Sequence, residues 1–187
     1  MTPHYPIITF TGDSGSGKST LAKELLTRRP SRFSLITSTT SRDSRETDLL
    51  GEYEPLTSDE FETLALRNPF LWSTSFAGNN YGTKKEYVDS ALASQYRSLM
   101  ILVPSVVPIL RDYAQDHNVL SFFCKTPPID VLRTRMRERG DREESIERRL
   151  SGIGRWEEEA RASDIPYIFV DTMYSIDENI AQILGHL

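Results

Sequence analysis

The stretch that most constrains the fold of this chain is Gly12–Thr20, which reads GDSGSGKST. It satisfies the pattern G-x-x-x-x-G-K-[ST] in full, with an apolar run at Ile7–Phe10 before it and an apolar stripe at Leu21 and Leu25 after it. In such a loop the glycines let backbone N–H groups point at phosphate, and the following helix adds its positive end. The sequence therefore predicts a strand, a phosphate loop and a helix that together hold a nucleoside triphosphate.

Two side chains of the loop have specific expected roles. Lys18 is expected to reach the β- and γ-phosphates, and the Ser19 hydroxyl to hold Mg²⁺. The full predicted nucleotide-binding set is Gly12, Asp13, Ser14, Gly15, Ser16, Gly17, Lys18, Ser19 and Thr20. The alternative is a Gly/Ser turn with an incidental lysine, and the flanking strand and helix patterns argue against it.

Short apolar runs predict the strands of a parallel sheet. Four of them are nearly continuous rather than alternating, which is typical of strands covered on both faces, and a fifth is weaker. The five runs are Tyr5–Thr11, Ser98–Val103, Val119–Cys124, Tyr167–Val170 and the weaker Phe33–Thr37. Because helical patterns separate them, the chain is expected to form an α/β fold of the P-loop NTPase type. Its sheet would be mostly parallel and five-stranded, with helices on both faces.

Helix signals fall between these runs. Capping boxes predict helix starts at Thr57 with Glu60 and at Ser175 with Glu178. One long charged helix is predicted from four apolar residues at helical spacing, Ile146, Leu150, Ile153 and Trp156.

The chain of 187 residues is long enough for one compact domain with modest insertions. We expect a single kinase domain with a core at 1–37, 89–138 and 163–187. The polar segment at about 38–88 would be a small acceptor-binding insertion, and the region at about 139–162 a lid.

Composition excludes several classes of protein. A net charge of −5 argues against a general nucleic-acid binder, and no apolar run approaches the roughly 18–20 residues that span a bilayer. The first residues lack a secretory signal, and Cys124 as the only cysteine permits no intramolecular disulfide. We therefore expect a cytoplasmic protein with neither nucleic-acid nor membrane partners.

The loop alone leaves several functional classes open. A GTPase should also contain N-K-x-D for guanine, and the chain has no such string. A large motor ATPase needs a longer chain and an apolar strand ending in Asp, whereas the run Leu99–Val103 is followed by Pro104 and Ser105. A small-molecule kinase that uses ATP and Mg²⁺ fits best.

Two groups of arginines could bind further phosphate. Arg42 and Arg45 lie three residues apart beyond a probable strand, although on spacing alone they could equally be solvated. Arg135 and Arg139 lie four apart and so share one helix face. The other arginines of this second region are expected on a solvated helix face: Arg133, Arg137, Arg142 and Arg148.

The order of motifs along nearly the whole chain resembles the guanylate kinase family. After the phosphate loop come Arg42 and Arg45, then Gly51, Phe70-Leu71, Gly78-Asn79-Asn80-Tyr81-Gly82-Thr83, Leu132–Gly140 and Ile146–Leu150. The resemblance implies an acceptor site lined by Ser38, Arg42, Arg45, Tyr81, Thr83 and Ser105. It also implies that Lys18 and the lid arginines Arg135, Arg139 and Arg149 are catalytic.

The chain departs from the family at the acceptor site. Glu54 stands where the family has a phosphate-binding tyrosine, with Tyr53 one place earlier, and Trp72 stands where a glutamate reads guanine. Val103 and Ser105 replace two aspartates. Losing a buried hydrogen-bonding partner should weaken guanine preference sharply. Trp72 could stack on a base or simply belong to the core.

These patterns predict transfer of the γ-phosphoryl group of Mg-ATP to a phosphate on a small acceptor, most simply a nucleoside monophosphate. One alternative is a ribose 1,5-bisphosphokinase-like enzyme that acts on a sugar phosphate. Another is an inactive guanylate-kinase-like binding module, but such modules tend to lose the lysine and lid arginines that this chain retains. The protein could be a monomer or a homodimer.

Overall fold

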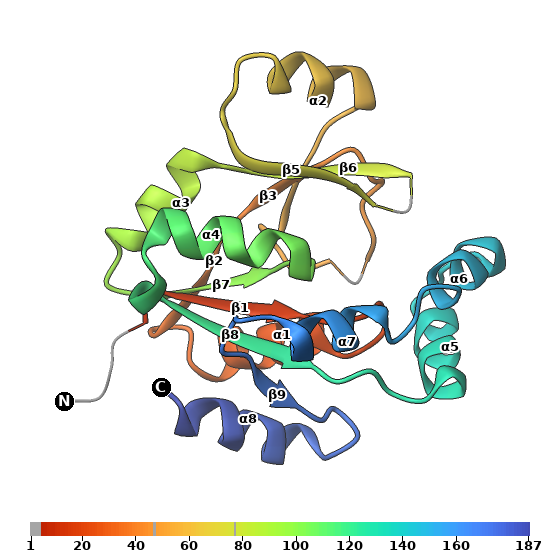
Figure 1. The fold of residues 1–187 in the computed structure, drawn as a ribbon. Coiled ribbons are helices and arrows are strands. Elements are labelled where there is room, and N and C mark those ends of the chain that lie inside the picture. The colour runs from red at the N-terminus through yellow and green to blue at the C-terminus, as the bar shows by residue number, and fades with distance from the viewer. Residues whose placement is uncertain (1–4, 47, 77) are drawn as a thin grey trace.

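Five parallel strands form the central sheet of the computed structural model, which describes residues 5–46, 48–76 and 78–187. Their order is β2-β7-β1-β8-β9 (Figure 1). Their bounds are β1 Ile7–Thr11, β2 Phe33–Leu35, β7 Arg97–Ile101, β8 Val119–Cys124 and β9 Ile168–Val170. Every residue of β1 and β8 is buried, which explains their continuous apolar character. The predicted five-stranded parallel sheet is confirmed.

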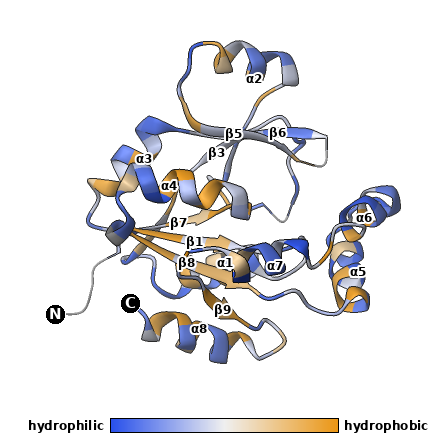
Figure 2. Ribbon diagram, in the orientation of Figure 1, coloured by the Kyte–Doolittle hydropathy of each residue, from blue (hydrophilic) through white to orange (hydrophobic). Residues whose placement is uncertain are grey.

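Helices cover both faces of this sheet. On one face, α1 (Lys18–Arg28) and α8 (Ile176–Gly185) bury Leu25 and Ile183 against Phe10. On the other face, α3 (Lys85–Leu92) and α4 (Val107–Ala114) pack around Met100. Hydropathy colouring shows the apolar residues gathered on the strands between these layers (Figure 2).

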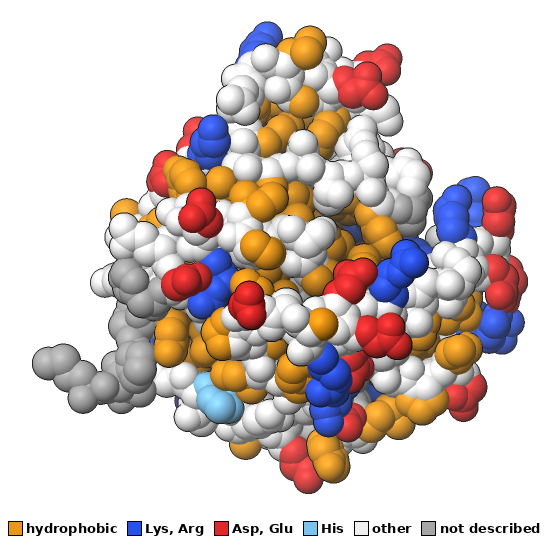
Figure 3. Space-filling model, in the orientation of Figure 1, with side chains coloured by type: hydrophobic (Ala, Val, Ile, Leu, Met, Phe, Trp, Pro, Cys, Tyr) orange, Lys and Arg blue, Asp and Glu red, His pale blue; other side chains and the backbone are white. Residues whose placement is uncertain are grey.

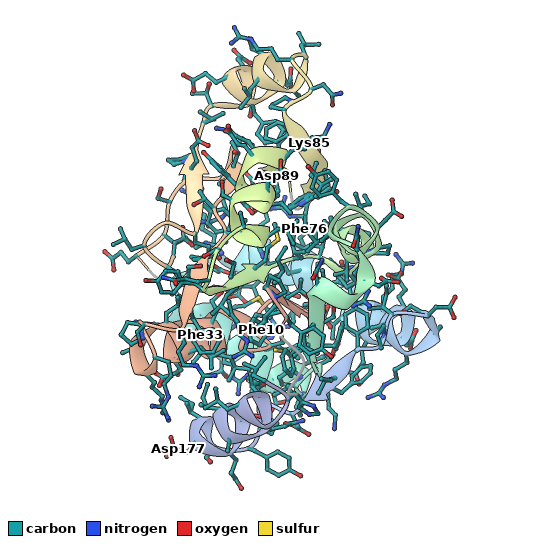
Figure 4. The ribbon with its side chains drawn as sticks, turned by 90° about the vertical axis from the view of Figure 1, so that its left-hand side faces the viewer. Phe10, Phe33, Phe76, Lys85, Asp89 and Asp177 are labelled. Atoms are coloured by element: carbon teal, nitrogen blue, oxygen red, sulfur yellow. The ribbon has the colours of Figure 1, made fainter. Side chains whose placement is uncertain are left out.

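A second, smaller sheet lies beyond α3 and α4 (Figure 1). Its order is β4-β3-β6-β5, with β3 at Ser38–Thr40, β4 at Tyr53–Pro55, β5 at Phe70–Phe76 and β6 at Asn79–Lys84. Helix α2 (Ser58–Ala65) lies at its far end. Figure 4 shows Phe76 in this upper sheet and Phe10 and Phe33 in the core below it.

Both predicted capping boxes open helices. At the start of α2, the Glu60 amide donates to Thr57 Oγ1 at 3.2 Å, and the Thr57 amide donates to Glu60 Oε2 at 2.7 Å. Ser175 and Glu178 make the same reciprocal pair before α8. These bonds satisfy amides that a helix start leaves without partners.

The prediction of one long helix from Ile146 to Trp156 is wrong. The chain forms α6 (Glu143–Leu150) and α7 (Arg155–Ala162), separated by a turn that ends at Gly154 with φ +85°. A helix cannot continue through that left-handed conformation, which glycine adopts readily. Helix α6 instead packs beside α5 (Ile129–Glu138) through the cluster Leu132, Met136, Ile146 and Leu150.

Two short 3₁₀ turns complete the described elements, at Pro104–Val106 and Asp116–Asn118. None of the helices within the described ranges is long and apolar enough to cross a membrane.

Candidate active site

The phosphate loop joins β1 to α1. Gly12 has φ +134°, and a Cβ there would lie 2.5 Å from the Cys124 carbonyl oxygen, so the tight approach of the loop to β8 requires glycine. Helix α1 begins after Gly17 with no side-chain cap and no acidic residue in its first turn. Its positive end is therefore available to an anion.

Lys18 lies at the base of the loop. Its Nζ donates to the carbonyl oxygens of Gly12 at 2.8 Å and Asp13 at 2.7 Å. Burial, with the nearby charges of Arg139 and Arg149, lowers the pKa of the Lys18 ammonium group to about 8. The lysine is thus held inside the loop, with a charge that depends on pH near neutrality.

Asp13 and Ser16 belong to the loop but do not line the cleft in front of it. The Asp13 carboxylate accepts hydrogen bonds from Thr126 Oγ1 at 2.7 Å and from the Gly154 amide at 3.2 Å. It therefore ties the loop to the β8–α5 connection and to the start of α7. Ser16 is fully buried. The remaining predicted loop residues, Gly12, Ser14, Gly15, Gly17, Lys18, Ser19 and Thr20, line the cleft.

The second end of the cleft is built on the smaller sheet. One guanidinium nitrogen of Arg42 lies 2.7 and 2.9 Å from the two carboxylate oxygens of Asp48, and the Arg42 guanidinium stacks 5.0 Å from the Tyr53 ring centroid. The Tyr53 and Tyr81 rings meet edge to face at 6.2 Å. These four side chains and Arg45 line one surface of the cleft.

Of the adjacent residues Tyr53 and Glu54, the tyrosine lines the cleft. Strand β4 pairs with β3, and the side chain of Tyr53 lies on the cleft side. Glu54 faces away and bonds Lys84 at 2.8 Å. Tyr53 therefore offers its side chain to the cleft one place before the position at which the family resemblance expects a tyrosine.

Three further predicted acceptor residues have different placements. Ser38 lines the cleft, and its hydroxyl lies 2.9 Å from that of Thr83, which is buried behind it. Ser105 does not reach the cleft: it is exposed and lines a separate small hollow beside Pro108 and Tyr167. The 3₁₀ turn that follows β7 carries Ser105 away, which corrects its assignment to the acceptor site.

The arginines predicted to belong to a lid lie on or at the end of α5 and on α6, the helix pair called the lid below, and two of them contact the phosphate loop. Arg135 donates to the Gly15 carbonyl oxygen and to the Thr172 carbonyl oxygen, both at 3.1 Å. Arg149 donates to Ser14 Oγ at 2.7 Å and lies 5.7 Å from the Phe76 ring centroid. Arg149 therefore touches both the phosphate loop and the smaller sheet, and Arg139 also lines the cleft.

By contrast, Arg133 and Arg137 lie on α5 and pair with glutamates of α6. They form ion pairs with Glu143, and Arg133 also pairs with Glu147. In the space-filling view, α5 and α6 form a projection whose surface mixes both signs of charge (Figure 3). The expectation of a solvated face holds for these two arginines.

The loop, the smaller sheet and the lid enclose one cleft of about 770 Å³. Alternate residues of β5, namely Trp72, Thr74 and Phe76, line one wall, and Trp156 packs on Phe76 with a centroid distance of 5.2 Å. Trp72 is only 6% exposed, and its indole N–H has no hydrogen-bond partner among the described residues. The wall is thus aromatic and carries no carboxylate on β5.

Among the described residues, no cluster of His, Cys, Asp or Glu could hold a metal ion by itself. Mg²⁺ commonly keeps several waters and binds through substrate phosphates with few protein ligands. Ser19 lies in the first turn of α1 and lines the cleft. Its hydroxyl group alone would therefore suffice as a protein ligand of Mg²⁺ bound to the phosphates.

This fold and this two-ended cleft define a P-loop phosphotransferase. The family model described as guanylate kinase matches residues 5–183. The chain is 38% identical over 160 residues to a guanylate kinase of Trichormus variabilis, covering 84% of this chain and 77% of that one. It is 33% identical over 171 residues to a guanylate kinase of Rickettsia prowazekii, covering 90% and 84%. The chain belongs to the guanylate kinase family and is an ATP-dependent kinase.

A solved structure agrees on the fold. The guanylate kinase of Anaplasma phagocytophilum superposes with a TM-score of 0.70 at 19% identity, over 99% of this chain and 85% of that one.

Proposed function

We propose that this protein transfers the γ-phosphoryl group of Mg-ATP to the phosphate of a nucleoside monophosphate. The observation that carries the proposal is the single cleft with a phosphate loop at one end and Arg42, Arg45 and Tyr81 at the other. Arg149 contacts the phosphate loop at Ser14 and the smaller sheet at Phe76. Two phosphate groups repel as they approach, and a guanidinium between them offsets that repulsion.

In this proposal each end has a defined task. Lys18 and the N-terminus of α1 hold the phosphates of ATP, and Ser19 with those phosphates would hold Mg²⁺, which neutralises charge on the phosphate oxygens. Arg42 and Arg45, with the Tyr53 and Tyr81 hydroxyl groups, hold the acceptor phosphate. Arg135, Arg139 and Arg149 stabilise the charge of the group in transfer. Catalysis then consists mainly of positioning and charge stabilisation.

The relatives are named guanylate kinases, so GMP is the first acceptor to test. The aromatic wall of Trp72 and Phe76 supports a base held by stacking more than by hydrogen bonds. We therefore propose that the site discriminates less among bases than it would with a carboxylate at position 72.

The test is ADP release from Mg-ATP with GMP, dGMP, AMP, CMP, UMP and ribose 1,5-bisphosphate, each compared with no acceptor. Release that depends on one or more monophosphates is expected. Release only with the sugar phosphate, or at an equal rate without any acceptor, contradicts the proposal. Lys18→Ala should abolish release while the circular dichroism spectrum stays unchanged.

Arg42→Ala separates the two ends of the cleft. Because Arg42 lies on the acceptor side, the variant should raise the acceptor KM by about 10-fold or more, in line with a lost charge-assisted bond. The KM for ATP should change little. Initial-rate kinetics with each substrate varied in turn measure both constants, and an effect confined to ATP would contradict the placement.

A further inference from the structure

One buried carboxylate lies among the arginines of the cleft. Asp141 stands in the turn between α5 and α6, and its side chain is 2% exposed. Its Oδ1 lies 3.3 Å from Arg139 Nε and 3.4 Å from a terminal nitrogen of Arg45, and its Oδ2 makes a close contact with Arg139. Its backbone amide donates to the Met136 carbonyl oxygen at 3.1 Å, which fixes the turn.

The carboxylate is ionised in this position. Burial alone would raise the pKa of Asp141, but the hydrogen bond from Arg139 and the charges of Arg139, Arg45 and Arg149 hold it below its usual range. Burial and neighbouring guanidinium groups lower the pKa of both Arg45 and Arg149, so these cations repel one another. The negative charge of Asp141, in contact with Arg45 and Arg139, therefore offsets part of the repulsion among these cations.

The arginines around Asp141 come from separate segments of the chain. Arg45 belongs to the loop between β3 and β4, and Arg139 to the end of α5. In the proposed function, the first contacts the acceptor phosphate and the second stabilises the group in transfer. Asp141 is the one described side chain with ionic contacts to both.

We propose that Asp141 is a positioning residue that couples acceptor binding to nucleotide binding. This inference rests on the proposed function. An acceptor phosphate that fixes the position of Arg45 also fixes Asp141 and, through Asp141, Arg139. Binding of one ligand therefore places the arginine that the other ligand needs. Such coupling is reciprocal: each ligand changes the affinity of the other by the same factor.

Asp141→Asn removes the charge but keeps the shape. Each ligand alone should bind at least as tightly as before, because the released arginines present more net positive charge to phosphate. The coupling factor and kcat should both fall, because the spacing of Arg45 and Arg139 is no longer fixed. A merely structural role would instead weaken every ligand and lower the thermal midpoint without removing the coupling.

The experiment measures the Kd of the non-hydrolysable Mg–β,γ-imido-ATP with and without saturating GMP, together with kcat, in wild type and Asp141→Asn. The lid supplies a matched control in Glu143→Gln, which removes an exposed carboxylate paired with Arg133 and Arg137. We expect at least about 5-fold coupling in the wild type and in the control, a typical allosteric factor. In Asp141→Asn the coupling should approach unity.

Three results would overturn the inference: no coupling in the wild type, equal coupling in both variants, or a rise in kcat/KM in Asp141→Asn. The last would mean that the carboxylate competes with phosphate. If Asp141→Asn does not fold, Asp141→Glu keeps the charge but moves it, and should show reduced coupling at unchanged thermal midpoint; full coupling there contradicts the inference. Failure of the proposed function is distinguishable, because it is a lack of acceptor-dependent turnover in the wild type.

Discussion

Lys18 is bonded to two backbone carbonyl oxygens of its own loop, and the pKa of its ammonium group is lowered to about 8. Below that pH the lysine is charged and attracts triphosphate; above it, the lysine loses its proton. We therefore predict that kcat/KM for ATP falls by about 10-fold for each pH unit above 8, because this ratio reports groups of the free enzyme.

The pH profile of kcat should differ. Bound phosphates stabilise the charged lysine and raise its pKa, so kcat should stay level to a higher pH than kcat/KM. Steady-state rates at constant ionic strength from pH 6.5 to 10 give both curves. A kcat/KM that is flat through pH 9.5 would contradict the placement of Lys18.

Trp72 leads to a prediction about the acceptor base. Replacing it by glutamate puts a hydrogen-bond acceptor on the wall of the cleft, which suits the N–H donors of guanine. Trp72→Glu should therefore raise the ratio of kcat/KM for GMP to that for AMP by about 10-fold or more, given what a paired buried group contributes. Trp72→Phe, which keeps an aromatic ring, is the matched control and should leave the ratio within a few-fold.

At the level of single residues, sequence patterns identified the phosphate loop and the arginines, but not the residues that hold those arginines in place. Tyr53 was not assigned to the acceptor site because the motif places its tyrosine one residue later, at Glu54. Asp48 and Asp141 were missed because a carboxylate in a polar loop has no signal of its own. Asp48 acts through its contact with Arg42, and Asp141 through its contact with the distant Arg45, and neither contact can be read from the sequence.

Among the elements, α5 and α6 are joined chiefly by four apolar side chains, Leu132, Met136, Ile146 and Leu150. This cluster is separate from the two clusters that line the central sheet. Helix α6 therefore depends on a small contact for its position, although it carries Arg149 into the cleft.

Met136→Ala should loosen the lid more than the core. Truncating a buried methionine removes about 2–5 kcal/mol from the packing that it supports. We expect faster amide hydrogen exchange in residues 139–150 and a lower kcat, with little change in exchange at β1 and β8. Arg137→Ala on the exposed side of α5 is the control and should change exchange only slightly. Uniform loss of protection in lid and core alike would contradict a separately stable lid.

The central strands were predictable because burial on both faces leaves continuous apolar runs such as Val119–Cys124. Most of the smaller sheet could not be predicted, because β3 and β4 are only three residues long and β3 consists of Ser and Thr. Apolar spacing alone also could not reveal the break between α6 and α7. That spacing continues through Ile153, and only the conformation of Gly154 ends the helix.

At the scale of the whole molecule, contacts within the described ranges join the acceptor side of the cleft to its other side. Arg45, in the loop between β3 and β4, pairs with Asp141, and Phe76 of β5 packs on Trp156. Arg149 adds a third by touching Ser14 and Phe76. These contacts hold the two sides of the cleft together in a closed arrangement. Such closure excludes water from the transferring group.

Trp156→Ala should weaken this closure. An aromatic pair contributes about 0.5–1.5 kcal/mol beyond its buried area, so the variant should raise the acceptor KM by about 3- to 10-fold. It should also raise the ratio of acceptor-free ATP hydrolysis to phosphoryl transfer, because water enters more easily. Parallel assays of ADP and product formation measure that ratio. An unchanged ratio would mean that the contact does not contribute to closure.

The chain contains only two tryptophans, and they lie in different surroundings. Trp72 is buried in the wall of the cleft, whereas Trp156 is partly exposed and rests on Phe76 across the gap between α7 and the smaller sheet. Separation of that ring pair would expose the Trp156 indole to solvent and shift its emission to longer wavelength. Trp156 is therefore an intrinsic fluorescent reporter of the contact between α7 and the smaller sheet, readable in stopped-flow experiments without any attached dye.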